Sequence, residues 1–418
     1  MLIIPKGIFT EILSLNAFMG FFMANANLKH AKKQKNDEFY TQYQDIQKEV
    51  NAYLEYDKEV FRGKTILLPC DDPEWSNFTK FFAQNFENFG IKKLISTSFA
   101  VESKNIEIDY EPSLFESIDP RFDKTKTRCK GKIFTLSQDE NRDGKINIDD
   151  LKWNYLEGDG DFRSDEVKKL RDEADIIITN PPFSLFREFV AWIMKADKKF
   201  LIIGNMNAIG CKEIFPLIKE NKMWLGVTNF NTGMYFRVPE EFVYAPSYKF
   251  DKERNGIKVN RVPGVCWFTN LEHGRRHQPL QLMTMEDNIK FSKHKEVQGV
   301  GYQNYDNYDA MEVPFTDAIP SDYEGIMGVP ISFLDKYCPE QFEILGSTQR
   351  GCHDSVPDRK KYDDYWEVRP NGEKTGSSGG KTNENPNIAR NNGKQNYFIN
   401  KDGHIVQSLY TRIFIRKK

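Results

Sequence analysis

The sequence predicts an α/β fold organised around a mostly parallel β-sheet, and three observations point to it. Short apolar runs rich in β-branched residues alternate with longer segments of helical periodicity. One of these runs, at residues 176–179, follows the acidic Asp175 and is β-branched and apolar without alternation, which is typical of a strand buried on both faces. The chain has 418 residues, more than one hydrophobic core usually serves, so we expect a second module beside the sheet domain.

Seven strands are predicted from the apolar runs. They lie at residues 65–70, 93–98, 152–156, 175–179, 199–205, 222–227 and 265–269. The first five alternate with helices and the last two follow without one, a pattern that predicts a sheet closed by an antiparallel hairpin. We expect one helix over about 77–88, capped by Ser76 or Asp72, and another over 185–194, capped by Ser184.

The strand at 175–179 ends at the most informative residues of the chain, which are Asn180, Pro181, Pro182 and Phe183. Prolines donate no backbone hydrogen bond, so the carbonyls beside them are left as acceptors at a strand end, where doubly wound folds bind ligands. The Asn180 side-chain carbonyl and the Pro181 main-chain carbonyl can hold both hydrogens of an amino group on a planar ring, and Phe183 can stack on that ring. The alternative is a plain strand-to-turn junction.

The totals of charged residues and cysteines set limits on partners and compartment. Lys and Arg number 59 against 61 Asp and Glu, a net charge of -2, so a nucleic-acid partner requires local basic patches rather than bulk charge. The six cysteines have no paired spacing, which excludes a disulfide framework or zinc-finger pattern and favours the cytoplasm. They are Cys70, Cys129, Cys211, Cys266, Cys338 and Cys352.

The first 26 residues are predicted to be an N-terminal extension or a misassigned start. Residues 1–22 are apolar enough to suggest a secretory signal, but Glu11 and Asn16 interrupt the run, which is too short to span a bilayer. Met23 then begins a polar segment, and residues 27–35 form a basic tract. That tract can contact phosphate or serve as a solvated arm.

Residues 103–150 are predicted to be an insertion. Within it, residues 139–150 carry the oxygen-bearing side chains and the glycine of a calcium loop. The flanking segments 133–136 and 146–148 alternate like strands, and Asp150 stands where a bidentate glutamate is usual, so a hairpin turn is the favoured interpretation. Calcium remains the alternative, and no other metal is expected.

Several elements, in one order along the chain, resemble those of the amino-methyltransferases of DNA. The signature of that group is Asn or Asp, two prolines and an aromatic residue, as at 180–183. The other matching residues are Phe39, Tyr40 and Thr41 before the first strand, Asp71 and Asp72 after it, and Asp161 and Phe162 after the third. The glycine-rich turn of most methyltransferases is absent. Residues 70–73 (Cys-Asp-Asp-Pro) and 76–78 (Ser-Asn-Phe) instead resemble the EcoRI adenine methyltransferase family.

That resemblance implies a Rossmann-like, seven-stranded sheet that uses S-adenosylmethionine. It implies that Phe39, Tyr40, Thr41, Asp71, Asp72, Asp161 and Phe162 hold this cofactor, with Asp161 accepting from its adenine amino group and Phe162 packing on the ring. The partner implied is double-stranded DNA, from which an adenine is flipped and methylated on its 6-amino nitrogen. A cognate restriction endonuclease that acts separately is a further implied partner.

The resemblance also suggests a division of the chain into a catalytic domain at 27–275 and a DNA target-recognition region at 276–418. In the latter, residues 328–330 (Gly-Val-Pro) and 333–337 (Phe-Leu-Asp-Lys-Tyr) resemble the same family. Residues 370–396 are rich in Gly, Asn, Ser and Lys and are expected to loop out. The chain is expected to end in a strand at 411–418.

Other chemistries fit the sequence less well. His273 and His277 have helical metal spacing but no third ligand, and no phosphate-binding glycine loop with a following lysine is present. A metal-dependent nuclease using Asp71, Asp72, Asp161 and Asp175 would leave the residues at 180–183 unexplained. Methylation of cytosine amino groups or of RNA or protein amides, and a DNA-binding protein with an inactive methyltransferase fold, remain the alternatives.

Overall fold

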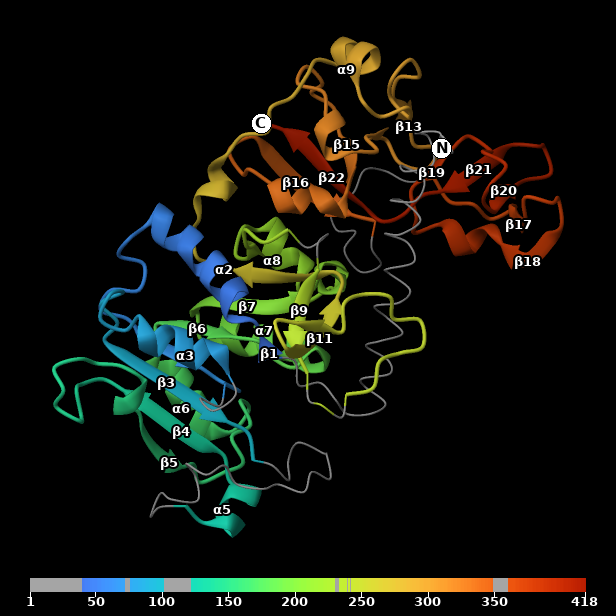
Figure 1. The fold of residues 1–418 in the computed structure, drawn as a ribbon. Helices are drawn as coiled ribbons and strands as arrows, with labels where there is room; N and C mark the ends of the chain where they lie inside the picture. The colour runs from blue at the N-terminus through green and yellow to red at the C-terminus, as the bar shows by residue number, and fades with distance from the viewer. Residues whose placement is uncertain are drawn as a thin grey trace, which may run out of the picture. The chain divides into compact units, whose positions relative to one another are not determined.

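The computed structural model describes residues 40–71, 76–100, 122–229, 233–238, 240, 242–348 and 360–418. The chain divides into two compact units: unit 1 comprises residues 1–208 and 224–274, and unit 2 comprises residues 209–223 and 275–418. The predicted extension at 1–26, the basic tract at 27–35, Phe39 and Asp72 lie outside the described residues. Each unit is built around its own β-sheets (Figure 1).

The main sheet of unit 1 has eight strands. In spatial order they are β5 (Lys152–Tyr155), β4 (Lys132–Leu136), β3 (Lys93–Ser98), β2 (Thr65–Leu68), β6 (Ile176–Thr179), β7 (Lys199–Asn205), β12 (Val265–Thr269) and β8 (Trp224–Leu225). The four central strands, β3, β2, β6 and β7, are parallel, and the strands beyond them on both sides pair antiparallel. The predicted α/β fold is thereby confirmed.

Helices cover both faces of this sheet, because its strands are apolar on both sides. Ile66 and Leu68 of β2 share one core with the helices α2 (Tyr43–Tyr56) and α3 (Asn77–Gln84) (Figure 1). The opposite face meets α7 (Phe186–Lys195), whose Phe186 ring lies 5.0 Å from that of Phe268 on β12. Among the described residues of unit 1, the remaining α-helices are α5 (Lys124–Cys129) and α6 (Asp165–Glu173).

The eighth strand, β4, makes the sheet larger than the seven strands predicted. The alternation at 133–136 was assigned to an inserted hairpin, but β4 pairs with β3 as well as with β5, so this hairpin extends the sheet itself. Residues 146–148 are not a strand, because Ile148–Asp150 form a short 3-10 helix, η2. The last two predicted strands are confirmed as an antiparallel pair that closes this side of the sheet, because β8 pairs with β12 and β12 pairs with β7.

Unit 1 has a second, antiparallel sheet, which combines residues 40–41 with strands from residues 234–262. Its order is β1 (Tyr40–Thr41), β9 (Met234–Arg237), β11 (Ile257–Val262) and β10 (Glu253–Arg254). Asn255 and Gly256 join β10 to β11 with φ values of 52° and 74°, the conformation that favours an Asn-Gly hairpin turn. This sheet ties residues 40–41, ahead of the first strand, to the β9–β11 hairpin.

Unit 2 contains two five-stranded sheets. One is ordered β13 (Gln303–Asn304), β14 (Met311–Glu312), β15 (Met327–Pro330), β22 (Arg412–Lys417) and β16 (Phe342–Ser347). The other is ordered β18 (Lys374–Ser378), β17 (Trp366–Val368), β20 (Tyr397–Ile399), β21 (Ile405–Ser408) and β19 (Asn387–Ile388). The α-helices in the described part of unit 2 are α8 (Phe215–Lys219) and α9 (Met285–Phe291). Its 3-10 helices include η6 (Thr316–Ala318), η7 (Ile331–Lys336) and η8 (Gly379–Thr382).

Two local predictions were wrong. Residues 370–396 do not loop out, because they form β18 and β19 of the sheet that contains β17, with the 3-10 helix η8 between them. Ser184 does not cap a helix: residues Phe183–Leu185 form a 3-10 turn, η3, and the N-cap of α7 is Leu185, which makes no side-chain capping bond. The predicted strand at the carboxyl end of the chain is confirmed as β22, and the predicted capping of α3 by Ser76 is confirmed by its bond from Phe78 N.

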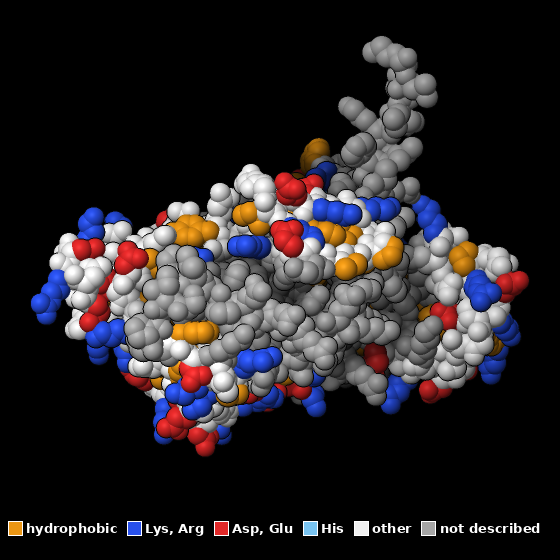
Figure 2. All heavy atoms as spheres, turned by 60° about the horizontal axis from the view of Figure 1, so that its bottom comes forward, with side chains coloured by type: hydrophobic (Ala, Val, Ile, Leu, Met, Phe, Trp, Pro, Cys, Tyr) orange, Lys and Arg blue, Asp and Glu red, His pale blue; other side chains and the backbone are white. Residues whose placement is uncertain are grey.

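The surface carries mixed charge. Among the described side chains on the face drawn in Figure 2, Lys and Arg, Asp and Glu and hydrophobic residues are interleaved, without a broad field of one sign. None of the helices built from the described residues combines the length and apolar character needed to cross a membrane. A partner with a charged surface must therefore be recognised by a local group of side chains.

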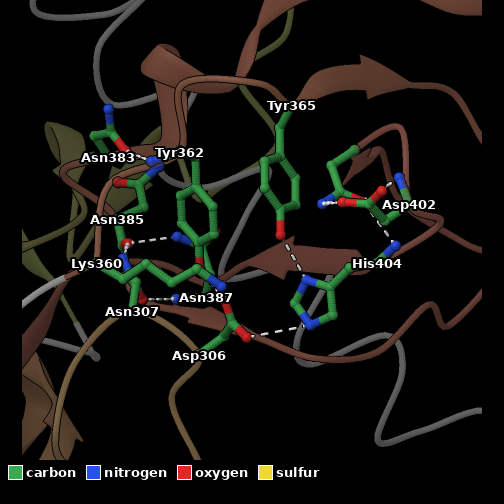
Figure 3. Close-up of polar contacts among 11 residues, drawn as sticks. Asp306, Asn307, Lys360, Tyr362, Tyr365, Asn383, Asn385, Asn387, Asp402 and His404 are labelled. Carbon is green, nitrogen blue, oxygen red and sulfur yellow. Dashed lines mark hydrogen bonds and ion pairs between the residues drawn. The ribbon is translucent and has the colours of Figure 1, made fainter.

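A polar network in unit 2 joins side chains beside the sheet that contains β17 to the segment that follows β13. Asp306 accepts a hydrogen bond from Tyr362 Oη at 2.7 Å and pairs with Lys360 at 3.3 Å and with His404 Nε2 at 3.3 Å (Figure 3). His404 Nδ1 lies 2.6 Å from Tyr365 Oη. We call these five side chains the Asp306 network; their polar atoms satisfy one another.

Candidate active site

The central parallel strands bring their carboxyl ends to one edge of the sheet, as the strand order requires. β2 ends in a turn at Cys70, whose φ of 72° is unusual for a residue with a side chain. This is the position where the glycine-rich turn was missing from the sequence, so the chain makes a left-handed turn there without glycine. Strained backbone of this kind is typical of functional sites.

Asp71 accepts hydrogen bonds from several elements that meet at this edge. Its buried carboxylate accepts from Ser76 Oγ at 2.6 Å and from Thr179 Oγ1 at 2.6 Å, and its carbonyl accepts from Thr79 Oγ1 at 3.0 Å and from Ser96. These donors come from α3, β3 and β6. Asp71 therefore fixes the turn after β2 to the end of β6, one residue before Asn180.

The predicted catalytic residues follow directly. Asn180 and Phe183 are partly exposed, whereas Pro181 is buried. The Pro182 carbonyl accepts from Leu185 N at 2.9 Å, but no described residue donates a hydrogen bond to the Pro181 carbonyl. The Phe183 ring meets Phe236 of β9 edge to face, with centroids 6.5 Å apart. The motif thus presents a main-chain acceptor and a positioned aromatic ring at the end of β6.

Thr41 joins the same edge through α3. Asn77, the first residue of α3 after the Ser76 cap, donates from Nδ2 to the Thr41 carbonyl at 2.7 Å. Thr41 also pairs with Phe236, the residue that packs on Phe183. A continuous series of contacts therefore runs from Thr41 through Asn77, Ser76, Asp71 and Thr179 to Asn180. The side chain of Tyr40 is not described.

Asp161 and Phe162 lie in the loop after β5, which approaches the end of β3. Gly160 adopts a φ of 87°, and a Cβ there would lie 2.4 Å from the Ser98 carbonyl, so only glycine fits. The Asp161 carboxylate is paired with Arg163, Oδ1 to Nε at 2.9 Å, and these hydrogen bonds lower the pKa of Asp161. Asp161 is therefore ionised but already has a cationic partner.

Phe162 is buried against the helix that follows the catalytic motif. Its ring contacts Phe189 and Trp192 of α7 edge to face, at 5.1 and 5.7 Å between centroids. This packing is what an ordinary core residue does. The structure therefore brings Thr41, Asp71 and Asn180 into one series of contacts. Among the described residues, Asp161 and Phe162 make no hydrogen bond or ring contact with that series.

Several buried polar atoms at this edge have no hydrogen-bond partner among the described residues. A polar cofactor that binds here could supply those partners. Thr41 Oγ1, Thr97 Oγ1 at the end of β3 and Asn205 Nδ2 at the end of β7 are buried, and none has a hydrogen-bond partner among the described residues. Buried polar atoms normally have a partner. Together with the buried Asp71 carboxylate at the same edge, they fit a ligand with ammonium and hydroxyl groups.

Three polar residues at this edge were not singled out in the sequence: Thr97, Thr179 and Asn205. Asn205 had the same signal as Asn180, an asparagine directly after an apolar strand. Thr179 and Thr97 had none, since a threonine inside an apolar run is ordinary in a strand. Their roles depend on neighbours distant in sequence.

The competing metal sites do not assemble. The described residues contain no group of three or more His, Cys, Asp or Glu side chains placed to hold an ion. His273 is buried and its Nε2 lies 3.0 Å from the Leu225 carbonyl. Asp175 directly precedes β6, at the edge opposite Asp71, and its carboxylate accepts from Thr65 N at 2.7 Å. In the calcium-like loop, the Asp139 and Asp150 carboxylates accept hydrogen bonds from backbone amides of the loop itself.

Comparisons with known proteins show the family of the chain. The family model described as adenine-specific methyltransferase EcoRI matches residues 27–418. The Type II methyltransferase M.EcoRI of Escherichia coli is 42% identical over 322 residues, covering 77% of this chain and 89% of that protein. The Type II methyltransferase M.MpnI of Mycoplasma pneumoniae is 35% identical over 316 residues, covering 75% and 83%. No solved structure matches the chain.

Proposed function

The chain belongs to the EcoRI family of adenine-specific methyltransferases, and from this premise we propose that it transfers a methyl group from S-adenosylmethionine to the 6-amino nitrogen of an adenine flipped out of double-stranded DNA. The observation that carries the proposal is the end of β6, where the Pro181 carbonyl has no donor among the described residues and the Phe183 ring is held by Phe236. An extruded base requires such a stacking surface and acceptors.

Catalysis by these residues rests on positioning. The Asn180 Oδ1 atom and the Pro181 carbonyl each accept one hydrogen of the adenine amino group, which draws the nitrogen lone pair out of conjugation with the ring and aims it. Phe183 holds the ring plane by stacking. Neither acceptor is a strong base, so the amino proton leaves to solvent after the nitrogen has been alkylated.

When bound, S-adenosylmethionine supplies an activated methyl group on a sulfonium. The residues that would hold it are Thr41, Asp71 and Asp161, with Phe39, Tyr40, Asp72 and Phe162 from the family resemblance. Support for the first two comes from the buried Thr41 Oγ1 and from the Asp71 carboxylate at the same edge. We further propose that Thr97 and Asn205 contribute polar contacts there, since both have a buried atom with no described partner.

The proposal extends to the organisation of the chain. We assign catalysis to residues 27–275, on a Rossmann-like sheet, and recognition of the DNA target to residues 276–418. Because the relatives are named Type II methyltransferases, we also propose a separately acting restriction endonuclease as the cognate partner, and a cytoplasmic location. The site geometry serves any planar amine, so cytosine remains the second candidate.

Product analysis tests the proposal. The purified chain is incubated with methyl-labelled S-adenosylmethionine and bacterial DNA, and the DNA is digested to nucleosides. We expect the label in N6-methyldeoxyadenosine. Label in N4-methyldeoxycytidine would favour the second candidate, and cofactor binding without any transfer would favour a DNA-binding protein with an inactive fold. Sequencing that detects modified bases then gives the recognised site.

A further inference from the structure

The β9–β11 hairpin carries a row of aromatic side chains that no predicted role accounts for. Phe242, Tyr244, Tyr248 and Phe250 contact one another in series, with ring centroids 5.3, 4.8 and 5.6 Å apart. We call residues 242–261 the aromatic–cationic segment. It lies in unit 1 and includes β10 and most of β11.

Cationic groups lie over these rings. Lys252 Nζ is 5.1 Å from the Tyr244 centroid, and Arg261 is 4.3 Å from that of Phe250. Arg254 lies 3.4 Å from the Tyr235 centroid on β9. The ring faces attract these cations and hold them in place at a modest energy each.

The rings act as a scaffold for the cations. Tyr244 Oη donates to the Val259 carbonyl at 2.8 Å, and Tyr248 Oη accepts from Arg261 N at 2.8 Å. Burial raises the pKa of Tyr248 to about 12, so its hydroxyl stays protonated. Because the rings pack on one another and their hydroxyls bind the hairpin backbone, the side chains presented to a partner are the cations.

The segment is locally basic although the chain is not. It contains five Lys and Arg residues against two Asp and Glu, whereas the whole chain has a net charge of -2. Lys249 and Lys252 are exposed, and neither forms an ion pair with the described residues, while Arg254 pairs with Asp251 at 2.9 Å. Exposed, unneutralised cations on a firm scaffold suit a polyanion.

The hairpin that carries this segment also supports the catalytic motif. Phe236 of β9 packs on Phe183, and β9 pairs with both β1 and β11. A polyanion bound by the segment is thereby connected through one hairpin to the ring that would stack on the target base.

We propose that the aromatic–cationic segment binds the phosphodiester backbone of the DNA beside the flipped adenine. This inference rests on the proposed function, of which it names one DNA contact. It assigns Lys249 and Lys252 to phosphate and gives them no part in reading the base sequence, since phosphate contacts position a protein without carrying sequence information.

The test measures binding of a mixed-sequence DNA duplex as a function of salt. The variant is Lys249→Gln with Lys252→Gln in the full chain. The matched control is Lys64→Gln with Lys92→Gln, two exposed lysines that precede β2 and β3 at the opposite edge of the main sheet. Each lost phosphate contact makes the slope of log K against log salt shallower by about 0.9, so we expect a change of about 1.8 for the variant and none for the control.

Three results would overturn the assignment. These are an unchanged slope in the variant, an equal change in the control, and a loss confined to DNA that contains the methylated site. The assay needs no methyl transfer, so it stands apart from the proposed function. An inactive wild-type chain with a shallower slope in the variant refutes the function and keeps the phosphate contact. An active wild-type chain whose slope equals that of the variant supports the function and refutes the phosphate contact.

Discussion

Two polar clusters of the molecule, one in each unit, differ in how far their hydrogen bonds are satisfied. In the Asp306 network of unit 2, the carboxylate meets Tyr362, Lys360 and His404, and His404 in turn meets Tyr365 (Figure 3). At the carboxyl edge of the main sheet in unit 1, Thr41 Oγ1 and the Pro181 carbonyl lack partners among the described residues. The side chains of the Asp306 network bind one another, whereas the edge of the main sheet retains polar atoms without a partner among the described residues.

The difference separates a structural role from a binding role. A satisfied buried network holds its elements together, and removal of a partner destabilises the fold. A buried polar atom without a partner costs about 1–3 kcal/mol, which a ligand can recover. We therefore expect substitutions in the Asp306 network to lower stability, and substitutions at the edge to lower binding or catalysis.

The largest effect is expected for Asn180→Ala. The variant loses one of the two acceptors that hold the adenine amino group, and loss of one preorganised hydrogen-bonding group typically lowers kcat by about a hundredfold to a thousandfold. Binding of S-adenosylmethionine should not change. The matched variant Asn180→Asp keeps an acceptor, as the family signature allows, and should retain more activity than Asn180→Ala. Full activity of Asn180→Ala in single-turnover methylation would reject this role.

Thr179→Val tests the hydrogen bond between Thr179 and Asp71, a pair at this edge that is already formed within the protein. The Thr179 hydroxyl donates to Asp71 and to the Pro69 carbonyl, so its loss leaves a buried carboxylate with one donor fewer. Hydrogen bonds to charged groups contribute about 1.5–3 kcal/mol, and we expect the free energy of unfolding to fall by that amount. The control Thr135→Val, on β4, should stay within about 0.5 kcal/mol. Equal urea midpoints for both variants would show that the bond to Asp71 does not stabilise the edge.

Tyr362→Phe removes one donor from the Asp306 network. We expect the free energy of unfolding to fall by about 1–2 kcal/mol, because Asp306 keeps Lys360 and His404. Affinity for S-adenosylmethionine should be unchanged. Tyr397→Phe in the same sheet is the control, since Tyr397 makes no side-chain hydrogen bond with the described residues. A larger effect from the control would contradict the structural role of the network.

Arg163→Gln tests Asp161, which is an expected cofactor residue but already has Arg163 as a partner within the protein. Arg163 lowers the pKa of Asp161, so their pairing stabilises the fold above an aspartate's usual pKa of 3.8 and is lost as pH falls through the lowered value. The pair is partly exposed and weak. If Asp161 accepts from the cofactor, its release should raise affinity for S-adenosylmethionine by about twofold to fivefold at neutral pH, as measured by calorimetry. A fall in affinity would indicate that Arg163 itself is needed.

The strands could be predicted from the sequence because continuous apolar runs such as 199–205 mark buried strands wherever they occur. The position of β4 could not, since its pairing with β3 spans a long stretch of chain and leaves no local signal. The same holds for the site: Asn180 follows from a strand end with two prolines, whereas the bond from Thr179 to Asp71 joins residues 108 positions apart. The segment at 242–261 had a signal in its four aromatic residues, at 242–250, and in the five basic residues at 249–261.

The most direct test compares Thr41→Val with Tyr365→Phe, measuring urea unfolding and the Kd for S-adenosylmethionine in each. Valine replaces a hydroxyl that has no described partner, so Thr41→Val should leave the free energy of unfolding unchanged or higher and weaken cofactor binding about fivefold to tenfold. Tyr365→Phe should lower the free energy of unfolding by about 1 kcal/mol and leave the Kd unchanged. A destabilised Thr41→Val with wild-type cofactor affinity would contradict the assignment of the unsatisfied edge to the cofactor site.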